Sequence, residues 1–378
     1  MMKGTFTITF LFVGSRKSRL ESSEKYAKEF FYSYDYFKNK YPSTEIIEFN
    51  DVINYSKLIK RLVKYLDKII RKLINFPFFM HEIVNLKNIT RIINTDVLVI
   101  TNDRIGFSIL PIIFLKKFKS HKYISTNVFV LGLFANLGTN SIQRFFQRRI
   151  LNLYFSAYDN FLFIGKSEYE LALAYADKYS NKFHYIPFCV DTNFWNSSNK
   201  KKDNDILFIG NDGNRDFQKA VKITKILKNN NFIFVTNNIS EKDVSEANVK
   251  LIAGHWNYNL LTDSQIRDFY DRSILTIIPL KDSIQPSGQS VALQSMSMGT
   301  PVLITNTVGF WDRSHFKDEE NIFFIDKNAS ISDWSKKVSE ILNNNKLLAG
   351  VSGNGNKLIH EKFNLKKFHM EIEKIMKI

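Results

Sequence analysis

Short apolar runs rich in β-branched and aromatic residues alternate with longer stretches whose apolar residues recur at helical spacing. The runs of the first half are TFTITFLFV, TEIIEF, DVLVIT, KYISTNVFVL, NFLFIG and FHYIPF, and those of the second half are DILFIG, NFIFVT, VKLIAG, ILTIIPL and PVLIT. Among the helices expected between them are residues 26–38, 141–154, 166–179 and 263–272. Strands that alternate with helices predict parallel sheets covered by helices on both faces.

The pattern starts again near residue 205, as if two similar sheets were joined. The stretch before it, IPFCVDTNFWNSSNKKKDND, has the Pro, Asn, Ser and Lys content of a linker. A chain of 378 residues is long enough for two domains. We therefore expect an α/β protein with two Rossmann-like, doubly wound domains that face each other across a cleft, residues 1–190 forming the first and 191–355 the second.

The formal net charge is +16, which favours a polyanionic partner, an anionic membrane surface or anionic substrates, unless it reflects only a bias toward Lys, Asn, Ile and Phe. The single cysteine, Cys189, excludes an intrachain disulfide and fits the cytoplasm. No apolar run reaches the roughly 18 residues of a spanning helix. No basic stripe with interleaved aromatics indicates a nucleic-acid module, so no nucleic-acid partner is expected.

Ligands of open α/β sheets bind beyond the carboxyl ends of the strands. Gly14, Ser15 and Arg16 follow the first strand, where a glycine and a basic residue allow an anion to approach, although an ordinary turn has the same composition. The polar residues 101–104, which include Asp103, follow DVLVI and suit either a cleft wall or a helix cap.

The run DILFIG ends at Gly210 and is followed by Asn211, Arg215 and Lys219. Arg215 and Lys219 are four positions apart, which places them on one face of a helix. Basic side chains beside a helix N-terminus favour binding of a diphosphate.

The segment IQPSGQSVALQSMSMGTPVLIT predicts a loop, a helix from Gln289 to Met298 and a buried strand. The free amides at a helix start carry partial positive charge, and Gly288 lets an anion come close. Ser287 and Ser290 can cap the helix or donate to oxygen atoms, and Gln294 lies about one turn further on, within reach of hydroxyls. This suits a nucleotide diphosphate-sugar better than a dinucleotide, because no G-x-G-x-x-G follows the first strand.

Metal ligands are not expected. The motif DND at residues 203–205 precedes its strand and so lies at the amino end, away from the ligand edge. The seven histidines are scattered and show no metal-ligand spacing. We therefore expect no metal and no cofactor beyond the nucleotide-sugar as co-substrate.

The segment from Ile284, followed by NTVGFWD, resembles the donor site of glycosyltransferase family 4, whose fold is GT-B. HYIPFCVDTNFW is similar to that family's hinge, DILFIGNDGNRDFQKAV to its diphosphate-binding turn, and LLTDSQIRDFYDRSILTIIPL to the segment that precedes the donor loop. KLIHEKFNLKKFHMEIEKIM resembles its closing helix, so residues 356–378 are expected to cross back to the N-terminal domain. The resemblance covers residues 160–378 and extends to the first half only in pattern.

The resemblance implies transfer of a sugar, with retention and without a metal, from a nucleotide diphosphate-sugar to a hydroxyl of a glycan or lipid-linked acceptor, in surface polysaccharide or lipopolysaccharide biosynthesis. Arg215, Lys219 and the amides of residues 288–290 would stabilise the leaving diphosphate. Of the family's two donor-site glutamates, one position holds Pro286 and the other Gln294. This suggests that Ser287, Gly288 and Gln289 hold the donor. Asp103 and His255 stay open as the catalytic base, and a GT-B epimerase or a non-catalytic polyanion- or membrane-binding subunit stays open as the alternative.

Residues 56–80, SKLIKRLVKYLDKIIRKLINFPFFM, form the most unusual segment of the first half. Apolar residues at helical spacing make one face, and seven Lys and Arg against one Asp make the other. Such a helix either packs on the sheet or rests on an anionic membrane surface, with FPFFM as its apolar edge. The second reading predicts a cytoplasmic protein held peripherally on the inner face of a membrane.

Overall fold

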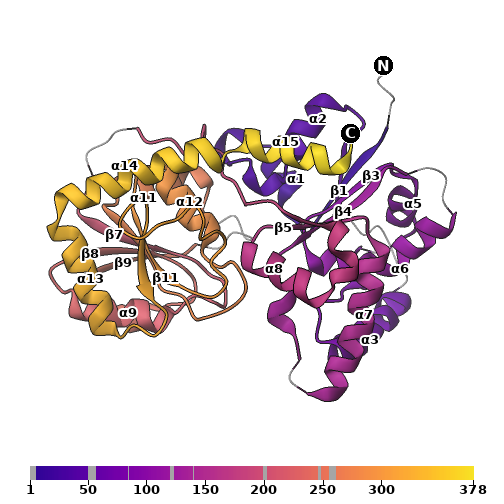
Figure 1. Ribbon diagram of the computed structural model, residues 1–378, viewed down its shortest axis with the longest axis horizontal. Coiled ribbons are helices and arrows are strands. Elements are labelled where there is room, and N and C mark those ends of the chain that lie inside the picture. Colours follow the sequence, from indigo (N-terminus) through magenta and orange to yellow (C-terminus); the bar gives the residue numbers. More distant parts are fainter. Residues whose placement is uncertain are drawn as a thin grey trace. The chain divides into compact units, whose positions relative to one another are not determined.

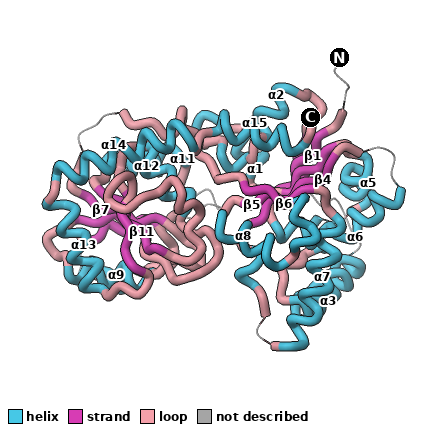
Figure 2. Tube along the Cα trace, viewed as in Figure 1, coloured by secondary structure: helices cyan, strands magenta, loops and turns pink. Residues whose placement is uncertain are grey.

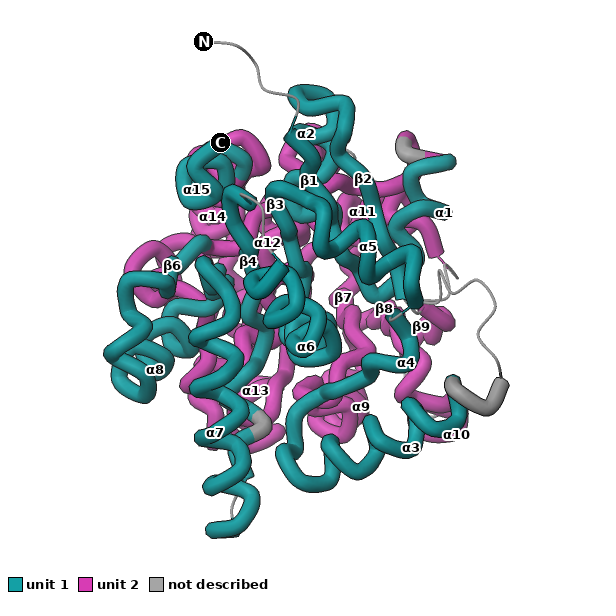
Figure 3. Tube along the Cα trace, turned by 90° about the vertical axis from the view of Figure 1, so that its right-hand side faces the viewer, with its two compact units in different colours: residues 1–21, 31–186, 369–378 teal, residues 22–30, 187–368 magenta. Residues whose placement is uncertain are grey.

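The computed structural model describes residues 6–49, 57–83, 85–119, 123–138, 140–198, 202–245, 248–254 and 261–378. The chain divides into two compact units, coloured separately in Figure 3. Unit 1 comprises residues 1–21, 31–186 and 369–378, and unit 2 comprises residues 22–30 and 187–368. The main boundary between the two units, at 186/187, lies four residues before the expected boundary at 190. In addition, residues 22–30 of the first half of the chain belong to unit 2, and residues 369–378 at its end belong to unit 1.

Unit 1 is built on six parallel strands in the order β2-β1-β3-β4-β5-β6. Strand β1 is buried at every position, and its register places Phe10 opposite Ile46 on one side and Val99 on the other. The strands are β1 (Ile8–Phe12), β2 (Glu45–Glu48), β3 (Val97–Ile100), β4 (Ser125–Val130), β5 (Asn160–Phe163) and β6 (Phe183–Tyr185). The helices are α1 (Arg16–Leu20), α2 (Tyr34–Lys40), α3 (Lys57–Ile74), α4 (Met80–Ile83), α5 (Leu86–Asn94), α6 (Asp103–Lys119), α7 (Ser141–Ala157) and α8 (Lys166–Tyr175), with 3-10 turns at Leu133–Asn136 and Asp177–Lys182.

Unit 2 has a second parallel sheet in the order β12-β11-β10-β7-β8-β9. The strand order reverses between β7 and β10, and the crevice at such a switch point is where doubly wound sheets bind ligands. The strands are β7 (Asp205–Ile209), β8 (Asn231–Val235), β9 (Val249–Ile252), β10 (Leu275–Ile278), β11 (Val302–Asn306) and β12 (Phe323–Asp326). The helices are α9 (Phe217–Ile226), α10 (Glu241–Val244), α11 (Asp263–Arg272), α12 (Gln289–Ser297), α13 (Ile331–Asn343) and α14 (Asn345–Lys362).

Helices cover both faces of the second sheet, with α9 and α13 on one side and α11, α12 and α14 on the other (Figures 1 and 2). Phe208, Phe234 and Trp334, all fully buried, lie in the core cluster of this unit. Parallel strands buried on both faces explain why these segments read as continuous apolar runs.

All eleven predicted strands are present, and the sequence missed only β12 among the described strands. The helix predicted for 263–272 has those bounds in the structure. The helix predicted for 166–179 is interrupted at Ala176, which separates α8 from the 3-10 turn that follows it. The continuous helix predicted for 26–38 is wrong. Tyr32 and Ser33 adopt left-handed conformations, with φ of 50° and 73°, which an α-helix cannot contain.

The closing segment forms two helices, α14 and α15 (Leu365–Met376), with a break at Phe363 and Asn364. The backbone amide of Val190 donates to the Phe363 carbonyl at 2.9 Å, which ties the break to the linker within unit 2. Residues 369–378 belong to unit 1. There the His369 ring stacks on Tyr36 and its Nδ1 lies 2.7 Å from the Ser33 hydroxyl.

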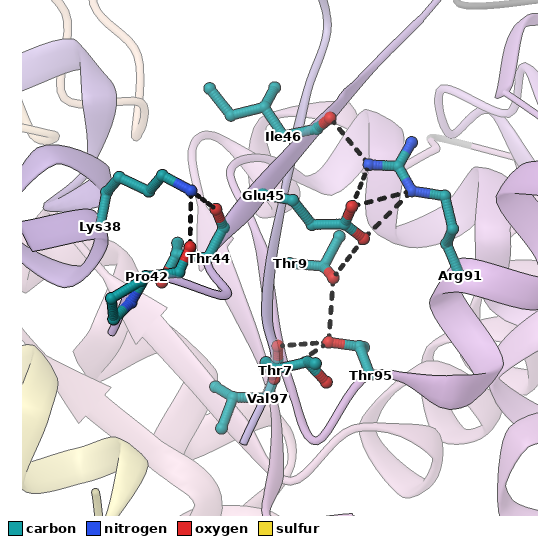
Figure 4. A network of polar contacts seen from close by, with 10 residues as sticks. All are labelled: Thr7, Thr9, Lys38, Pro42, Thr44, Glu45, Ile46, Arg91, Thr95 and Val97. Atoms are coloured by element: carbon teal, nitrogen blue, oxygen red, sulfur yellow. Dashed lines mark hydrogen bonds and ion pairs between the residues drawn. The ribbon is translucent and has the colours of Figure 1, made fainter. Parts of the chain in front are cut away.

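A polar network in unit 1 fixes α5 to the edge of the sheet (Figure 4). Arg91 donates to both carboxylate oxygens of Glu45, with Nη2–Oε2 at 2.5 Å, and to the carbonyl of Ile46 at 3.2 Å. Thr9 on the neighbouring strand donates to the same carboxylate at 3.2 Å. The bidentate pair therefore links a helix to two strands, and its role is structural.

Candidate functional site

A pocket of about 370 Å³ opens in unit 2 at the carboxyl ends of β7 and β8. This is the ligand-binding edge of a doubly wound sheet, and the volume lies in the range typical of small-ligand sites. Apolar and polar side chains share its wall, which is lined by Phe30, Trp195, Ile209, Gly210, Asn211, Asp212, Arg215, Val235, Gly254, Leu261, Asp263, Ile266, Ser290, Val291 and Gln294. Every one of these residues belongs to unit 2.

Arg215 is the basic residue of the pocket wall, and only 2% of it is exposed. Its Nε donates to the carbonyl of Ile209 at 3.3 Å and lies 3.4 Å from the Asp212 carboxylate. Its Nη1 is buried and has no hydrogen-bond partner in the part of the chain that the structure describes. A buried guanidinium nitrogen without a partner is costly, so the geometry favours an anionic ligand that accepts from it.

Two glycines with positive φ, Gly210 at 153° and Gly288 at 79°, lie against the Arg215 side chain. A Cβ at Gly288 would stand 2.9 Å from Arg215 Nη1 and 2.9 Å from Ile278 Cγ2. A Cβ at Gly210 would overlap Arg215 Nε. The guanidinium can lie here only because both neighbours lack a side chain.

Helix α12 begins beside this guanidinium, with Gly288 as its N-cap and no side-chain cap. The hydroxyl of Ser287 accepts from Asn214 Nδ2 at 2.7 Å, so Ser287 does not cap the helix, and Gln289 is buried. Ser290 lies in the first turn and on the pocket wall. The partial positive charge of the helix start adds to that of Arg215, and together they make a site for a phosphate-like anion.

Gln294 lies one turn further along α12, and its amide is held from both sides. Its Nε2 donates to Glu29 Oε1 at 2.9 Å, and its Oε1 accepts from the Tyr270 hydroxyl at 3.2 Å. Glu29 Oε1 also accepts from the Trp195 indole at 2.7 Å, and its Oε2 accepts from the Asp191 amide at 3.2 Å. Glu29 therefore lies directly behind the wall that Trp195 and Gln294 form.

Glu29 was not singled out by the sequence, because it stands 265 residues from Gln294 in a segment expected to be an ordinary helix. Burial, together with the nearby Asp263 carboxylate, raises the pKa of Glu29 to about 8. Near neutral pH the group is therefore largely uncharged. A neutral carboxyl keeps one negative charge out of the surroundings of the anion site.

We expect the protonation of Glu29 to be detectable in the pH dependence of the protein's stability. Because the folded pKa of Glu29 exceeds its unfolded value, the folded state holds the proton more tightly, and stability is lost as pH rises. Relative to Glu29→Gln, the wild-type free energy of unfolding should fall by roughly 1.4 kcal/mol per pH unit between the two pKa values. Urea unfolding of both proteins at several values from pH 5 to pH 9 measures the difference. Parallel curves would contradict it.

Two further residues predicted after β7 are held by the protein itself. Asn211 accepts from the Thr236 hydroxyl at 3.1 Å and the Asn237 amide at 2.7 Å, and donates to the Gly254 carbonyl, so it joins the loops around the pocket. Lys219 donates to the Ala329 carbonyl at 3.3 Å and is not among the lining residues. Arg215 precedes α9, so it does not share a helical face with Lys219 as expected.

Gly14 and Ser15 lie between β1 and the short helix α1 in unit 1, and Arg16 begins that helix. The amides of Arg16 and Lys17 donate to the Glu48 carboxylate at 2.6 and 3.1 Å. A protein carboxylate thus occupies the position that the sequence assigned to a ligand anion.

Asp103 lines a separate pocket of about 140 Å³ in unit 1, together with Asn102, Arg104 and residues 131–133. Its carboxylate accepts from the Leu131 amide at 2.9 Å and from the Tyr154 hydroxyl at 3.3 Å. Burial raises the pKa of Asp103 to about 7, which suits a group that exchanges a proton near neutral pH. The other candidate base, His255, lies outside the described residues.

Asp203 of the DND motif is paired with Arg272, whose Nε lies 2.8 Å away, at the amino end of β7. In the described part of the chain, no three His, Cys, Asp or Glu side chains are grouped to hold a metal ion. The described helices include none that is both long and apolar enough to cross a bilayer.

Comparison with known proteins places these features in a family context. Residues 190–358 match the family model described as glycosyl transferases group 1. No curated protein matches the sequence. Similar solved structures include Anabaena HepE in complex with UDP, at 9% identity and a TM-score of 0.67, with 98% of this chain and 100% of that chain covered.

Two more solved structures share the fold over nearly their whole length. Sucrose-phosphate synthase from Thermosynechococcus elongatus has 12% identity and a TM-score of 0.66, with 98% of both chains covered. A glycosyltransferase from Rickettsia africae has 12% identity and a TM-score of 0.63, again with 98% of both chains covered. The two parallel six-stranded sheets therefore form the GT-B fold, as the sequence predicted.

Proposed function

We propose that this chain, whose residues 190–358 match the glycosyl transferases group 1 model, transfers a sugar from a nucleoside diphosphate sugar to a hydroxyl group of an acceptor. The observation that carries the proposal is the buried Nη1 of Arg215, which finds no hydrogen-bond partner in the described part of the chain and lies beside the start of α12, where no side chain caps the helix. Both are positive, both are preorganised, and they lie at the switch point of the sheet. The UDP and UDP-glucose in the HepE structures support a nucleoside diphosphate as the ligand.

In this proposal the diphosphate lies against Arg215 Nη1 and the amides of residues 288–290. Negative charge develops on the diphosphate as its bond to the anomeric carbon breaks, and fixed donors that need no reorganisation stabilise that charge. Gln294, held by Glu29 and Tyr270, offers its amide to a ribose hydroxyl. The apolar side chains of Val235, Leu261 and Ile266 provide a wall for the nucleobase.

We propose that the configuration at the anomeric carbon is retained, and the resemblance to glycosyltransferase family 4 supports this. For the acceptor we propose a hydroxyl of a glycan or of a lipid-linked sugar, in surface polysaccharide or lipopolysaccharide biosynthesis on the cytoplasmic side of a membrane. Asp103 is the proposed base in unit 1, because its raised pKa allows it to accept a proton near pH 7.

The test of the proposed function is a titration of the purified chain with UDP, GDP, ADP and their glucose conjugates, followed by thermal unfolding. A nucleotide present at about 100 times its dissociation constant adds about 2.7 kcal/mol of stability. We expect one nucleoside diphosphate to bind, and its sugar conjugate to be turned over with a suitable acceptor or slowly by water. Stabilisation without any turnover would favour a non-catalytic binding subunit, and no stabilisation by any nucleotide would overturn the proposal.

We expect turnover to continue in the presence of a chelator. The charge on the diphosphate is stabilised by Arg215 and the start of α12, and the DND motif lies at the opposite end of β7 from the pocket. Initial rates with EDTA and with added Mg²⁺ or Mn²⁺ should agree within a factor of about two. Loss of activity with EDTA and its recovery with either ion would show that the metal-free account is incorrect.

A further inference from the structure

Helix α3 presents large apolar side chains to solvent. Its inner face carries Asp67 and Ile74, both buried, and Asp67 accepts from His81 Nδ1 and from the His81 amide, at 2.6 and 3.0 Å. The outer face carries residues that are 41–64% exposed: Leu62, Tyr65, Leu66, Ile69 and Leu73. The apolar face that the sequence predicted is thus divided between the core and the surface.

The first two turns of α7 have the same character, which the sequence did not suggest. Ile142 is 71% exposed, Phe145 is 55% exposed and Phe146 is 39% exposed. Helices α3 and α7 pack side by side in unit 1 (Figures 1 and 2). Ile69 and Leu73 of α3 and Ile142 of α7 line one shared groove. Through these three side chains the exposed apolar surfaces of the two helices adjoin each other, and an exposed apolar patch of this kind marks a contact site.

The charges around this patch have a single sign. The exposed charged residues of the two helices, from Lys60 onward, are Lys60, Arg61, Lys64, Lys68, Lys72, Arg144, Arg148 and Arg149. The sequence of α7 contains no acidic residue, and the one acidic residue of α3, Asp67, is buried against His81. Apolar side chains surrounded by Lys and Arg alone are complementary to an anionic lipid surface.

We propose that α3 and the first half of α7 form one docking surface for an anionic lipid bilayer. The apolar residues enter the boundary between head groups and acyl chains, and the basic residues contact lipid phosphates. Each basic residue near such a surface raises the partition coefficient roughly fivefold, the equivalent of about 1 kcal/mol. Eight exposed basic residues together with the apolar patch provide the two signals that stable peripheral binding requires.

A second copy of this chain is the competing occupant, and the charges argue against it. Two such patches facing each other would bring eight positive charges against eight more without an exposed acidic side chain on either helix pair. Like charges placed opposite one another disfavour that contact.

The position of the surface agrees with the proposed function but does not depend on it. Helix α7 follows β4, so its first turn lies at the carboxyl edge of the unit 1 sheet, where ligands of such sheets bind. A protein docked through this surface would have that edge close to lipid head groups, within reach of a lipid-linked acceptor. Bilayer binding itself needs neither nucleotide nor acceptor.

The experiment is co-sedimentation of the full chain with vesicles of phosphatidylcholine alone and of phosphatidylcholine with phosphatidylglycerol, at low and moderate salt. We expect at least tenfold stronger binding to the vesicles that contain phosphatidylglycerol, and weaker binding as salt rises. Analytical ultracentrifugation without lipid shows whether the wild type self-associates instead.

Three variants test the surface. Lys60, Arg61, Lys64 and Lys68 changed to Glu should reduce binding more than tenfold, and Leu62, Leu66, Ile142 and Phe145 changed to Ser should abolish the binding that survives at moderate salt. The matched control changes Lys346, Lys357, Lys362 and Lys366, which are exposed on α14 and α15, to Glu. It lowers the net charge from +16 to +8, as the first variant does, and should bind like the wild type.

Circular dichroism and cooperative thermal unfolding establish that each variant is folded. Equal binding of the wild type to both kinds of vesicle, equal loss in the control and the first variant, or a stable wild-type dimer that the serine variant dissolves would overturn the docking surface. None of these outcomes bears on sugar transfer, which is measured separately with a soluble acceptor.

Discussion

Replacement of Arg215 by alanine is expected to reduce transfer by a factor of about 100 to 1,000, the usual consequence of losing one preorganised donor to a developing oxyanion. The side chain is buried, and its Nη1 has no hydrogen-bond partner among the described residues, so its removal would leave the proposed diphosphate site without its principal basic contact. Affinity for the nucleoside diphosphate should fall as well. The fold should persist, because the lost protein contacts are one bond to the Ile209 carbonyl and a long ion pair with Asp212. Steady-state rates and calorimetric titration with nucleotide measure both effects.

Two further variants make this experiment specific to Arg215. Arg272→Ala removes an arginine of the same unit that is paired with Asp203 at the other end of β7, and it should leave kcat and nucleotide affinity unchanged. Arg215→Lys keeps the charge but not the planar, multiply donating group, and should recover only part of the rate. If Arg215→Ala turned over donor at the wild-type rate, the diphosphate site would lie elsewhere.

Gly288→Val should weaken donor binding as strongly as the loss of Arg215. Its φ of 79° is unfavourable for any β-branched residue, and its Cβ would stand 2.9 Å from Arg215 Nη1. The strain costs on the order of 1–3 kcal/mol, and the guanidinium must move. Gly213→Val is the matched control, because a Cβ there meets nothing within 4 Å. The two nucleotide dissociation constants, measured side by side, should differ by at least tenfold, and equal values would contradict this account of α12.

Gln294→Glu is expected to be milder than Gly288→Val. The new carboxylate would face Glu29, but a Glu29 with a pKa of about 8 keeps a proton that it can donate to its neighbour. A reversed order of the two donor affinities would show that the amide of Gln294, and not the approach to Arg215, dominates donor recognition.

The apolar runs alone were sufficient for the architecture. A strand buried on both faces needs an uninterrupted apolar segment, so each of the eleven strands could be predicted from its own local sequence. The short strand β12 did not, because NIFFID is bounded by charged residues and pairs only with β11 at the edge of its sheet. Left-handed residues such as Tyr32 and Ser33 also left no local signal, since neither is a glycine and tertiary packing holds their conformations.

The site divides in the same way. A glycine at a strand end or helix start, with a basic residue nearby, favours anion binding, and this pattern predicted most of the site. The structure brings the predicted residues to one pocket or to its arginine: Gly210, Arg215, Gly288, Ser290 and Gln294. Lys219 and Arg16 also follow a strand that ends near a glycine, so the sequence pattern around them is similar. The structure directs Lys219 to the Ala329 carbonyl and places the Glu48 carboxylate at the Arg16 amide. Spacing along the chain does not specify which partner a long side chain meets.

The sequence by itself determined the two parallel sheets, the carboxyl edge of the second sheet as the candidate ligand edge and the residues proposed to meet an anion there, because each depends on neighbours within a few positions. Only the tertiary structure decided that Glu29 holds Gln294 from behind, that Asp67 is buried, and that α7 joins α3 in one exposed apolar patch. Each of these depends on segments that are far apart in the chain. Such contacts are selected by the packing of whole elements, which no local pattern of apolar and polar residues records.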